Sequence, residues 1–510
     1  MPEELIAVLD FGGQYSHLIA RRIRECEVYS ELLPFDTKPA ELRDLNTRAI
    51  ILSGGPASVY EEGAPKCDPR IFEMGVPVLG VCYGLQLMVQ ALGGHVKATN
   101  RHEYGKTNLR IRDTADLFKG VSDRINAWMS HGDYADSLPP DFEAIADSES
   151  CPTAAIRDRS RKLFGVQFHP EVAHTEHGTR ILRNFVAISN CRPTWNPRSI
   201  INDSIREIKA RVGNEKVLCA VSGGVDSTAT AVLVHRAVGD KLTCIFVNHG
   251  LLRKDEEKTM KTLAKDFGLN LRYVDASERF LRELRGVSDP EEKRKIIGEQ
   301  FIRVFEEESR KLGTFHWLAQ GTLYPDVIES AASGSPASRI KSHHNVAGIP
   351  EWSRFKTIEP FRFLYKDEVR KVGRELGLPD EIVSTHPFPG PGLAVRIVGE
   401  VTGDKLRICR EASAIVESVL TTRGLYGKVW QAFALVGDDR AVGVEGDHRQ
   451  VGHIVTVRIV ESTDGMTADW SRIPYDVLEE ISSRITGQVR GVTWVAYAVT
   501  SKPPSTIEPC

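Results

Sequence analysis

The chain contains 510 residues, of which 41% are hydrophobic and 26% charged, and its formal net charge is −3. This length exceeds what one hydrophobic core usually serves, so we expect two or three domains. With this small negative net charge, the protein has no overall positive potential that would attract the phosphates of a nucleic acid, which argues against nucleic acid as a partner. No apolar run approaches the ~20 residues that span a bilayer, so we expect no membrane attachment.

The nine cysteines form no C-x-x-C pair, and their odd number fits no disulfide framework. This usage is typical of a reduced protein without structural zinc. The acidic start "MPEELIAVLDFGG" does not resemble a signal peptide. We therefore expect a cytoplasmic protein.

Three regions follow one another along the chain. Residues 1–190 alternate short apolar runs with helical patterns, which predicts an open α/β sheet. Two prolines in 190–199 mark a linker, set at 191–198, and a second α/β sheet domain is expected over 199–385. Residues 386–510 alternate strand patterns with a helix around 474–486, which predicts a small α+β domain. The expected fold class is thus α/β, with two open sheets and a smaller C-terminal domain.

A cysteine stands between an apolar run and an amphipathic helix in "PVLGVCYGLQLMVQ". The frame around Cys82 is G-x-C-x-G, a nucleophile elbow with sulfur in place of oxygen. A helix N-terminus beside the sulfur favours the reactive thiolate. Taken alone, such a cysteine is more often a buried structural residue at a strand end.

Two further stretches favour the catalytic interpretation. "FGVQFHPE" places His169 and Glu171 two residues apart at a strand end, where they share a face and the carboxylate can orient the imidazole. A base held by a third group is what activates a thiol. In "ILSGGP", backbone N–H groups of Gly54 and Gly55 are candidates to join that of Tyr83 in an oxyanion hole.

These residues resemble the class I glutamine amidotransferase family over nearly the whole first region. The resemblance implies a Cys82, His169 and Glu171 triad that releases ammonia from glutamine through a thioester. It also implies that "MSHGD" (129–133) helps to seat the glutamine. The expected glutamine-binding and oxyanion residues are Gly54, Gly55, Tyr83, Gln86, His131, Gly132 and Asp133.

The second region begins with a strand, a glycine turn and a helix in "KVLCAVSGGVDSTATAV". No lysine follows the glycines, so the Walker pattern fails. "SGGVDS" (222–227) instead resembles the PP-loop family of ATP pyrophosphatases, which implies attack on the α-phosphate and departure of intact pyrophosphate. Backbone N–H groups, serine hydroxyls and a helix N-terminus suit that leaving group, with magnesium balancing the charge. The alternative is a turn that only caps a helix.

"CIFVNHGLLRKDE" lies one βα unit later, where an adenine is expected at a strand end beside Val247. The family usually has aspartate at the position of Asn248. Asp326 in "GTLYPDVIES" is a candidate contact to magnesium or pyrophosphate, or alternatively a helix N-cap. The expected ATP-binding residues are Ser222, Gly223, Gly224, Val225, Asp226, Ser227, Val247 and Asp326, while the metal ligands stay unknown.

The whole chain resembles the glutamine-hydrolysing GMP synthetase family. Four stretches carry this resemblance: "IKSHHNVAGIP", "HPFPGPGLAVR", "DGMTADW" and "TSKPPSTIE". It implies that ATP adenylates XMP at O2 and that ammonia then displaces AMP to give GMP, in guanine nucleotide biosynthesis. The implied partners are glutamine, ATP, XMP and Mg²⁺, and the implied assembly is a homodimer through residues 386–510.

XMP is a dianion at its phosphate, so cations should converge on it. The loop "SRIKSHH" supplies several, although alone it reads as a solvated basic loop. Arg294 resembles a family position near XMP, but it is equally consistent with a surface charge on a helix. The family commonly ends in "TIEWE" where this chain has "TIEPC". The expected XMP-binding residues are Arg294, Lys341, His343, His344, Gln431, Lys502, Ser505, Thr506, Ile507 and Glu508.

Two other functions fit parts of the pattern. A glutamine-dependent NAD synthetase also joins a PP-loop to a glutaminase, but that glutaminase is of the nitrilase type and lacks the G-x-C-x-G and H-P-E motifs. A catalytically silent scaffold would have lost residues such as Cys82 or Asp226, and both are present. Release of AMP with and without XMP distinguishes the three.

Overall fold

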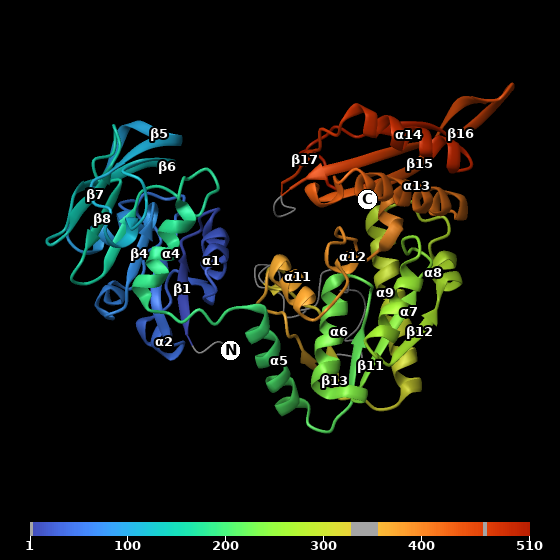
Figure 1. The fold of residues 1–510 in the computed structure, drawn as a ribbon, viewed down its shortest axis with the longest axis horizontal. Coiled ribbons are helices and arrows are strands. Elements are labelled where there is room, and N and C mark those ends of the chain that lie inside the picture. Colours follow the sequence, from blue (N-terminus) through green and yellow to red (C-terminus); the bar gives the residue numbers. More distant parts are fainter. Residues whose placement is uncertain (1–3, 328–354, 463–466) are drawn as a thin grey trace. The chain divides into compact units, whose positions relative to one another are not determined.

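The computed structural model describes residues 4–327, 355–462 and 467–510, and the chain divides into two compact units, Met1–Ile200 and Ile201–Cys510 (Figure 1). The predicted XMP-binding residues Lys341, His343 and His344 lie outside the described residues. None of the helices in the described ranges has the length and apolar character of a membrane span.

The first unit is built on a nine-stranded mixed sheet of order β2-β1-β3-β4-β9-β8-β7-β5-β6. The first five strands in this order are parallel, and they read as continuous apolar runs because both faces are covered. The strands are β1 (Leu5–Asp10), β2 (Ser30–Pro34), β3 (Thr47–Leu52), β4 (Val78–Val81), β5 (His95–Ile111), β6 (Arg124–Ser137), β7 (Glu143–Asp147), β8 (Ala155–Asp158) and β9 (Leu163–Val166). The helices are α1 (Ser16–Arg24), α2 (Pro39–Asp44), α3 (Tyr83–Ala91) and α4 (Gly178–Ser189).

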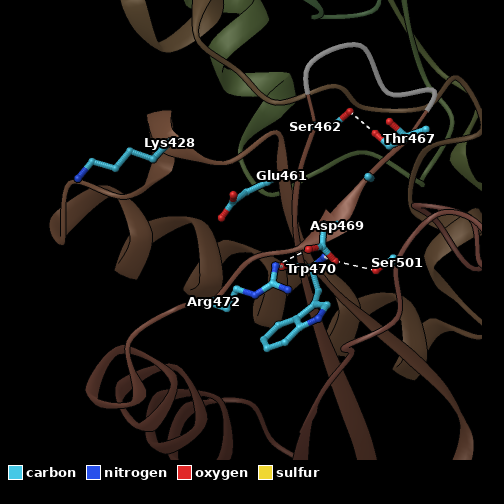
Figure 2. Close-up of a pocket in the computed structure, with 9 residues that line it drawn as sticks. Lys428, Glu461, Ser462, Thr467, Asp469, Trp470, Arg472 and Ser501 are labelled. Carbon is cyan, nitrogen blue, oxygen red and sulfur yellow. Dashed lines mark hydrogen bonds and ion pairs between the residues drawn. The ribbon is translucent and has the colours of Figure 1, made fainter. Parts of the chain in front are cut away.

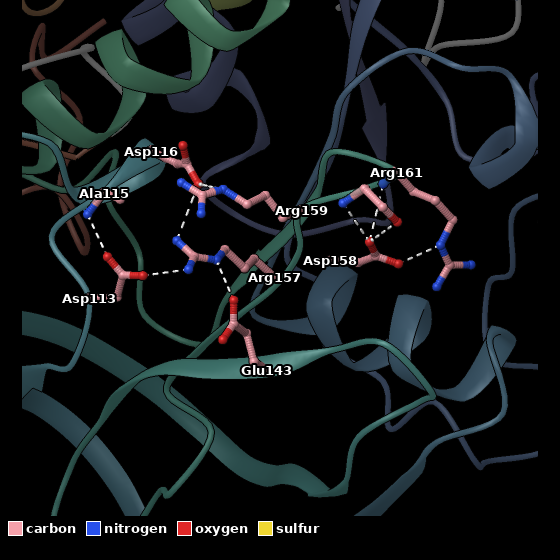
Figure 3. A network of polar contacts seen from close by, with 9 residues as sticks. Asp113, Ala115, Asp116, Glu143, Arg157, Asp158, Arg159 and Arg161 are labelled. Atoms are coloured by element: carbon pink, nitrogen blue, oxygen red, sulfur yellow. Dashed lines mark hydrogen bonds and ion pairs between the residues drawn. The ribbon is translucent and has the colours of Figure 1, made fainter.

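A buried arginine ties together the antiparallel half of this sheet (Figure 3). Arg157 on β8 is 3% exposed and forms ion pairs with Asp113, with Asp116 at 3.2 Å and with Glu143 of β7 at 2.8 Å. A buried guanidinium needs such partners because desolvating an unpaired charge is costly. This network joins β7 and β8 to the segment that follows β5.

The second unit contains a five-stranded parallel sheet of order β12-β11-β10-β13-β14. The strand order reverses direction at β10, so the carboxyl end of β10 is a topological switch point, where open α/β sheets bind ligands. The strands are β10 (Val217–Ala220), β11 (Leu242–Asn248), β12 (Leu271–Asp275), β13 (Trp317–Ala319) and β14 (Lys356–Ile358). The helices are α5 (Pro197–Val212), α6 (Val225–Val238), α7 (Glu256–Asp266), α8 (Ser277–Glu283), α9 (Pro290–Leu312), α11 (Lys366–Glu375) and α12 (Asp380–Val383).

The last part of the chain forms a smaller sheet with two helices. Strands β15 (Gln431–Glu445) and β16 (His448–Glu461) make a long antiparallel hairpin, which β17 (Asp469–Trp470) and β18 (Val492–Tyr497) extend. Helix α13 (Gly403–Thr422) packs against β15, and helix α14 (Tyr475–Gln488) packs against β18. The predicted fold class is confirmed: a mixed α/β sheet, a parallel α/β sheet and a small α+β part.

One hydrophobic core serves most of the second unit. The same cluster of buried side chains contains Leu218 and Ile245 from the parallel sheet and Ile408 and Val455 from the last part of the chain. A contiguous core of this kind normally marks one domain. The second sheet and the last part of the chain therefore pack as one body.

Candidate active sites

The proposed nucleophile stands on a sharp turn between β4 and α3. Cys82 has φ +51° and ψ −106°, an unusual conformation for a residue with a side chain. The turn requires the flanking glycines, because a Cβ on Gly80 would lie 2.5 Å from the backbone N of Leu85 and a Cβ on Gly84 would overlap the carbonyl oxygen of Leu52. The elbow predicted from the G-x-C-x-G pattern is thus present in the backbone.

The histidine and the carboxylate predicted to assist it meet at the same sheet edge. Nδ1 of His169 donates to Oε1 of Glu171 at 2.8 Å, and both side chains are buried. Burial lowers the pKa of His169, but Glu171 and Cys82 raise it, and the net pKa lies well above its usual range. Within the described residues, Oε2 of Glu171 has no hydrogen-bond partner. The arrangement favours an imidazolium that can stabilise a thiolate.

A glycine lies against both members of this pair. A Cβ on Gly54 would be 3.2 Å from Cε1 of His169 and 3.9 Å from Cβ of Cys82. A Cβ on Gly55 would be 2.9 Å from the carbonyl oxygen of Phe11. The strand-to-loop turn after β3 therefore approaches the thiol closely, as an oxyanion hole requires.

The residues expected to seat glutamine gather around the middle of β6. The carbonyl oxygen of Ser130 lies 3.7 Å from Sγ of Cys82, and Nε2 of Gln86 donates to the carbonyl oxygen of Asp133 at 2.8 Å. Nδ1 of His131 lies 3.0 Å from the same carbonyl oxygen. Gly132 completes the segment, while the hydroxyl of Tyr83 points elsewhere and donates to Pro65.

Two residues of this pocket are absent from the sequence prediction. Gln167 donates from Nε2 to Sγ of Cys82 at 3.5 Å, and its place two residues before His169 in the same quoted stretch was an available signal. Glu103 accepts hydrogen bonds from His131 at 3.1 Å, from Ser148 at 2.7 Å and from Ser150. No sequence signal identifies Glu103, because its partners are 28 to 47 residues away.

The glycine turn of the second unit lies at the switch point after β10. Gly223 has φ +82°, and a Cβ there would lie 3.0 Å from Oε1 of Glu256. Gly224 has φ −75°, and the nearest atom to a Cβ would be Oγ of Ser222 at 3.6 Å. Oγ of Ser222 and Ser227 are 3.1 Å apart. The protein itself therefore requires glycine at 223, whereas at 224 it leaves the space beside the backbone open.

The acidic residue of this turn is already in an ion pair. Asp226 accepts through Oδ2 from Lys366 on α11, and among the described residues its buried Oδ1 has no partner. A Cβ on Gly321 would be 3.0 Å from the carbonyl carbon of Asp226, so the segment that follows β13 approaches the turn closely. Lys366 was not predicted, because it is 140 residues from Asp226 and belongs to no quoted motif.

The remaining predicted ATP residues lie near the end of a strand or the start of a helix. Val247 is buried near the end of β11, and Val225 is buried at the start of α6. Oδ1 of Asn248 accepts from the backbone N of Gly250 at 2.9 Å, and its Nδ2 donates to the hydroxyl of Tyr273 at 3.2 Å. Asn248 thus holds the turn after β11.

Asp326 makes a local contact of the kind expected for a capping residue. Its Oδ2 accepts from the backbone N of Leu323 at 3.0 Å. The helix begins at Tyr324, so Leu323 is the N-cap and Asp326 stands at N3, where its carboxylate satisfies the N-cap amide. The N-cap alternative is therefore wrong in detail: Asp326 caps the helix from its first turn.

The predicted acceptor residues of the last region converge on the tail, defined here as residues 498–510. Glu508 accepts from Gln431 at 2.8 Å, and Arg294 donates to the carbonyl oxygen of Cys510 at 2.7 Å. Lys502 pairs with Ala468 through its backbone. The hydroxyls of Ser505 and Thr506 are engaged within the tail, and the carbonyl oxygen of Ile507 accepts from Arg458.

A hollow of about 790 Å³ lies beside this tail (Figure 2). Asp469 accepts there from Ser501 at 2.6 Å, and the guanidinium of Arg472 lies 4.5 Å from the ring centre of Trp470. None of the predicted XMP-binding residues that the structure describes lines it. The lining consists of Lys428, Glu461, Ser462, Thr467, Ala468, Asp469, Trp470, Arg472 and Ser501.

Comparisons with known families divide the chain in the same order as its motifs. Residues 7–188 match the family described as glutamine amidotransferase class-I. Residues 198–295 match the family described as NAD synthase, and residues 418–509 match the GMP synthase C terminal domain. The C-terminal match and the class I glutaminase together exclude the nitrilase-type NAD synthetase alternative.

Full-length relatives agree with this division. A glutamine-hydrolyzing GMP synthase from Synechocystis is 56% identical over 99% of this chain and 95% of its own length. Another from Caldanaerobacter subterraneus is 55% identical over 99% of both chains. Identity at this level over nearly the whole length means that the chain belongs to the glutamine-hydrolysing GMP synthase family.

Proposed function

We propose how the residues of this chain divide the work of GMP synthase, the glutamine-dependent amination of XMP in guanine nucleotide biosynthesis. Cys82 is the nucleophile of the glutaminase, His169 its acid and base, and Glu171 the group that orients the imidazole. The observation that carries this assignment is the elbow at Cys82 beside the 2.8 Å contact between His169 and Glu171.

The glutaminase step follows from this geometry. Sγ of Cys82 attacks the side-chain amide carbon of glutamine, and the oxyanion is held by N–H groups of Gly54, Gly55 and Tyr83. The imidazolium of His169 donates its proton to the departing ammonia, which leaves a thioester. Water, deprotonated by the same imidazole, then cleaves the thioester to glutamate and restores the thiol. Gln86, His131, Gly132 and Asp133 seat the substrate.

ATP binds at the turn after β10 in this proposal. The backbone N–H groups of Gly223 and Gly224, the hydroxyls of Ser222 and Ser227 and the N-terminus of α6 hold the β- and γ-phosphates, while Val225 and Val247 pack around the nucleotide. Asp226 and Asp326 supply carboxylate oxygens. The unpartnered Oδ1 of Asp226 fits Mg²⁺, a hard cation that takes oxygen ligands and neutralises phosphate charge when bound.

The acceptor site completes the reaction. O2 of XMP attacks the α-phosphorus of ATP and releases pyrophosphate; ammonia then adds to C2, and AMP departs to leave GMP. We assign contacts with XMP to the tail and its neighbours, because cationic and polar groups converge there. The set comprises Arg294, Gln431, Lys502, Ser505, Thr506, Ile507 and Glu508, together with Lys341, His343 and His344.

The organisation of the chain is part of the proposal. We assign residues 1–190 to the glutaminase, 191–198 to the linker, 199–385 to the ATP pyrophosphatase and 386–510 to XMP binding and dimerisation, in a cytoplasmic homodimer. The exposed side chains of Val444, Val451 and Trp494 on the smaller sheet support a second copy as the partner, because an apolar surface of this kind is usually covered. Sedimentation at micromolar concentration tests this, and a fully active monomer would contradict it.

Replacement of the nucleophile tests the division of labour. Cys82→Ala is expected to abolish GMP formation from glutamine and to leave formation from added ammonium salts largely intact, because thiol chemistry and adenylation use different residues. A folded variant that also fails with ammonia would refute the assignment. Lys502→Ala tests the acceptor site separately, since it should raise the KM for XMP about tenfold to a hundredfold, the loss of one charge-assisted contact.

A further inference from the structure

The tail is held by a buried arginine on the central strand of the smaller sheet. Arg458 of β16 is 4% exposed. Its guanidinium donates to the carbonyl oxygens of Thr500 at 2.9 Å, Thr506 at 2.9 Å and Ile507 at 2.7 Å, and to Oγ of Ser505 at 3.0 Å. All four acceptors belong to the tail, so one planar group fixes both ends of the segment 500–507.

A second buried arginine holds the carboxylate that follows. Arg396, the last residue of the short 3₁₀ helix η7 (Gly392–Arg396), is 2% exposed. Its Nη2 and Nε donate to Oε1 of Glu508 at 3.0 and 3.3 Å. Its guanidinium carbon lies 4.2 Å from the ring centre of Phe433 and 5.0 Å from that of Phe388. The rings exclude water and restrict the guanidinium to the orientation that meets Glu508.

These contacts make the tail part of the folded structure when no acceptor is bound. A buried guanidinium without partners is strongly disfavoured, so the free energy that pairs the two arginines also fixes the path of the tail. Other contacts hold the tail at separate points. The backbone of Lys502 pairs with that of Ala468, and Ser501 donates to Asp469. Ala498 donates to the carbonyl oxygen of Val457. Terminal segments are poorly ordered unless they are tied down, and the two arginines supply six hydrogen bonds that tie this one.

We propose that Arg396 and Arg458 are positioning residues of the acceptor site, which hold the tail in its binding conformation before XMP arrives. XMP then binds to groups that folding has already ordered, so less conformational entropy is lost on binding and the affinity is higher. The inference rests on the proposed function, in which tail residues contact XMP, and it adds that two side chains with no contact to XMP set the affinity for it.

The test compares methionine and lysine variants at both positions, because methionine keeps much of the length without the charge and lysine keeps the charge without the planar fork. Arg423→Met is the matched control: it removes an exposed arginine of the same region, paired with Glu480 and Asp476. Two quantities are measured with ammonia as nitrogen source: the KM for XMP against kcat, and hydrogen exchange at the amides of Lys502 and Ser505 without XMP.

In Arg458→Met we expect tail exchange at least about tenfold faster and a KM for XMP raised about tenfold to a hundredfold, the loss of several charge-assisted bonds. In Arg396→Met we expect the larger change in KM, because among the described residues only Gln431 still donates to the carboxylate of Glu508. The KM values for ATP and glutamine and the kcat at saturating XMP should change by less than about threefold. Arg423→Met should match the parent protein in both quantities.

If a methionine variant does not fold, the corresponding lysine variant tests the proposal instead. One ammonium group cannot reach all of the acceptors, so the lysine variant should show the same changes in tail exchange and in the KM for XMP, but smaller. Unchanged tail exchange in folded variants would overturn the proposal, as would a loosened tail with an unchanged KM for XMP. A failure of the acceptor assignment itself is recognised separately, since Lys502→Ala would then leave the KM for XMP unchanged while the arginine variants still loosen the tail.

Discussion

Replacing Glu171 by glutamine tests the glutaminase geometry most directly, because the structure penalises both orientations of the new amide. If the amide oxygen faces Nδ1 of His169, the NH₂ group takes the place of Oε2, which is buried and has no partner in the described part of the chain. An unsatisfied buried donor costs about 1–3 kcal/mol. If the NH₂ group faces Nδ1 instead, the imidazole must carry its proton on Nε2, and the base no longer presents a lone pair to the thiol.

The removed charge adds to this effect, because Glu171 is a main cause of the raised pKa of His169. Together these losses should reduce the kcat for glutamine-dependent GMP formation by about 10²–10⁴-fold, as for other triads deprived of the orienting carboxylate. The alkaline limb of the pH profile should also move to lower pH, because the imidazolium loses its proton more easily.

The assay measures GMP formation from glutamine and from ammonium salts in the same preparation, across pH. Ammonia-dependent synthesis serves as the internal control and should match the parent enzyme. A Glu171→Gln variant that retains more than about one third of the glutamine-dependent rate would refute the reasoning, since a threefold loss of rate corresponds to a rise of less than about 1 kcal/mol in the activation free energy. Equal loss with both nitrogen sources would show instead that the substitution damages the fold.

Three further expectations follow from residues described above. Gly223→Ala should lower the free energy of unfolding by about 1–2 kcal/mol, because position 223 has a positive φ and Glu256 lies close to it. Gly224→Ala should affect only ATP-dependent activity. Equal thermal midpoints for the two variants would contradict this expectation. Burial raises the pKa of Glu103, but the hydrogen bonds from His131 and two serines lower it more, to about 2. The carboxylate therefore stabilises the folded state at pH values above its unfolded pKa of about 4.3, and this stabilisation is lost as the pH falls toward 2. Glu103→Gln should therefore flatten the acid limb of stability in denaturant titrations at several pH values, and an unchanged limb would count against it. Asn248→Asp should leave the KM for ATP and the stability unchanged within about 0.5 kcal/mol, because a carboxylate can accept from both Gly250 and the Tyr273 hydroxyl; a lowered KM would instead indicate a contact between the carboxylate and ATP.

The residues that sequence reasoning identified are those whose chemistry imposes a local spacing. The elbow needs glycines two residues on either side of Cys82, and the carboxylate that orients His169 stands two residues after it, so both patterns are readable without a structure. The predicted strand was too long, because β9 ends at Val166 and the pair lies in the segment after it. The PP-loop is equally local. The pattern alone does not distinguish position 223, where the positive φ requires glycine, from position 224, where the backbone conformation is open to other residues.

The residues that escaped sequence reasoning act through partners far along the chain. Arg396 meets Glu508 across 112 positions, and Arg458 meets Thr506 across 48. A buried arginine in a strand pattern looks like an outward polar residue until the packing is known. The sharing of one core between the parallel sheet and the last region was also invisible, because the proline-rich segment at 386–393 gives the signal of a boundary.

The shared core of the second unit has a consequence for how the protein loses its structure. Because Leu218 and Val455 belong to one buried cluster, unfolding of the smaller sheet would expose apolar surface of the parallel sheet to water. Calorimetry should therefore record a single cooperative transition for residues 201–510. Unfolding of either part would expose core surface of the other part to water, so the two are expected to unfold together. A destabilising substitution in α13 would then raise the fraction of molecules in which the glycine turn at 222–227 is unfolded, although no contact at the turn itself is altered.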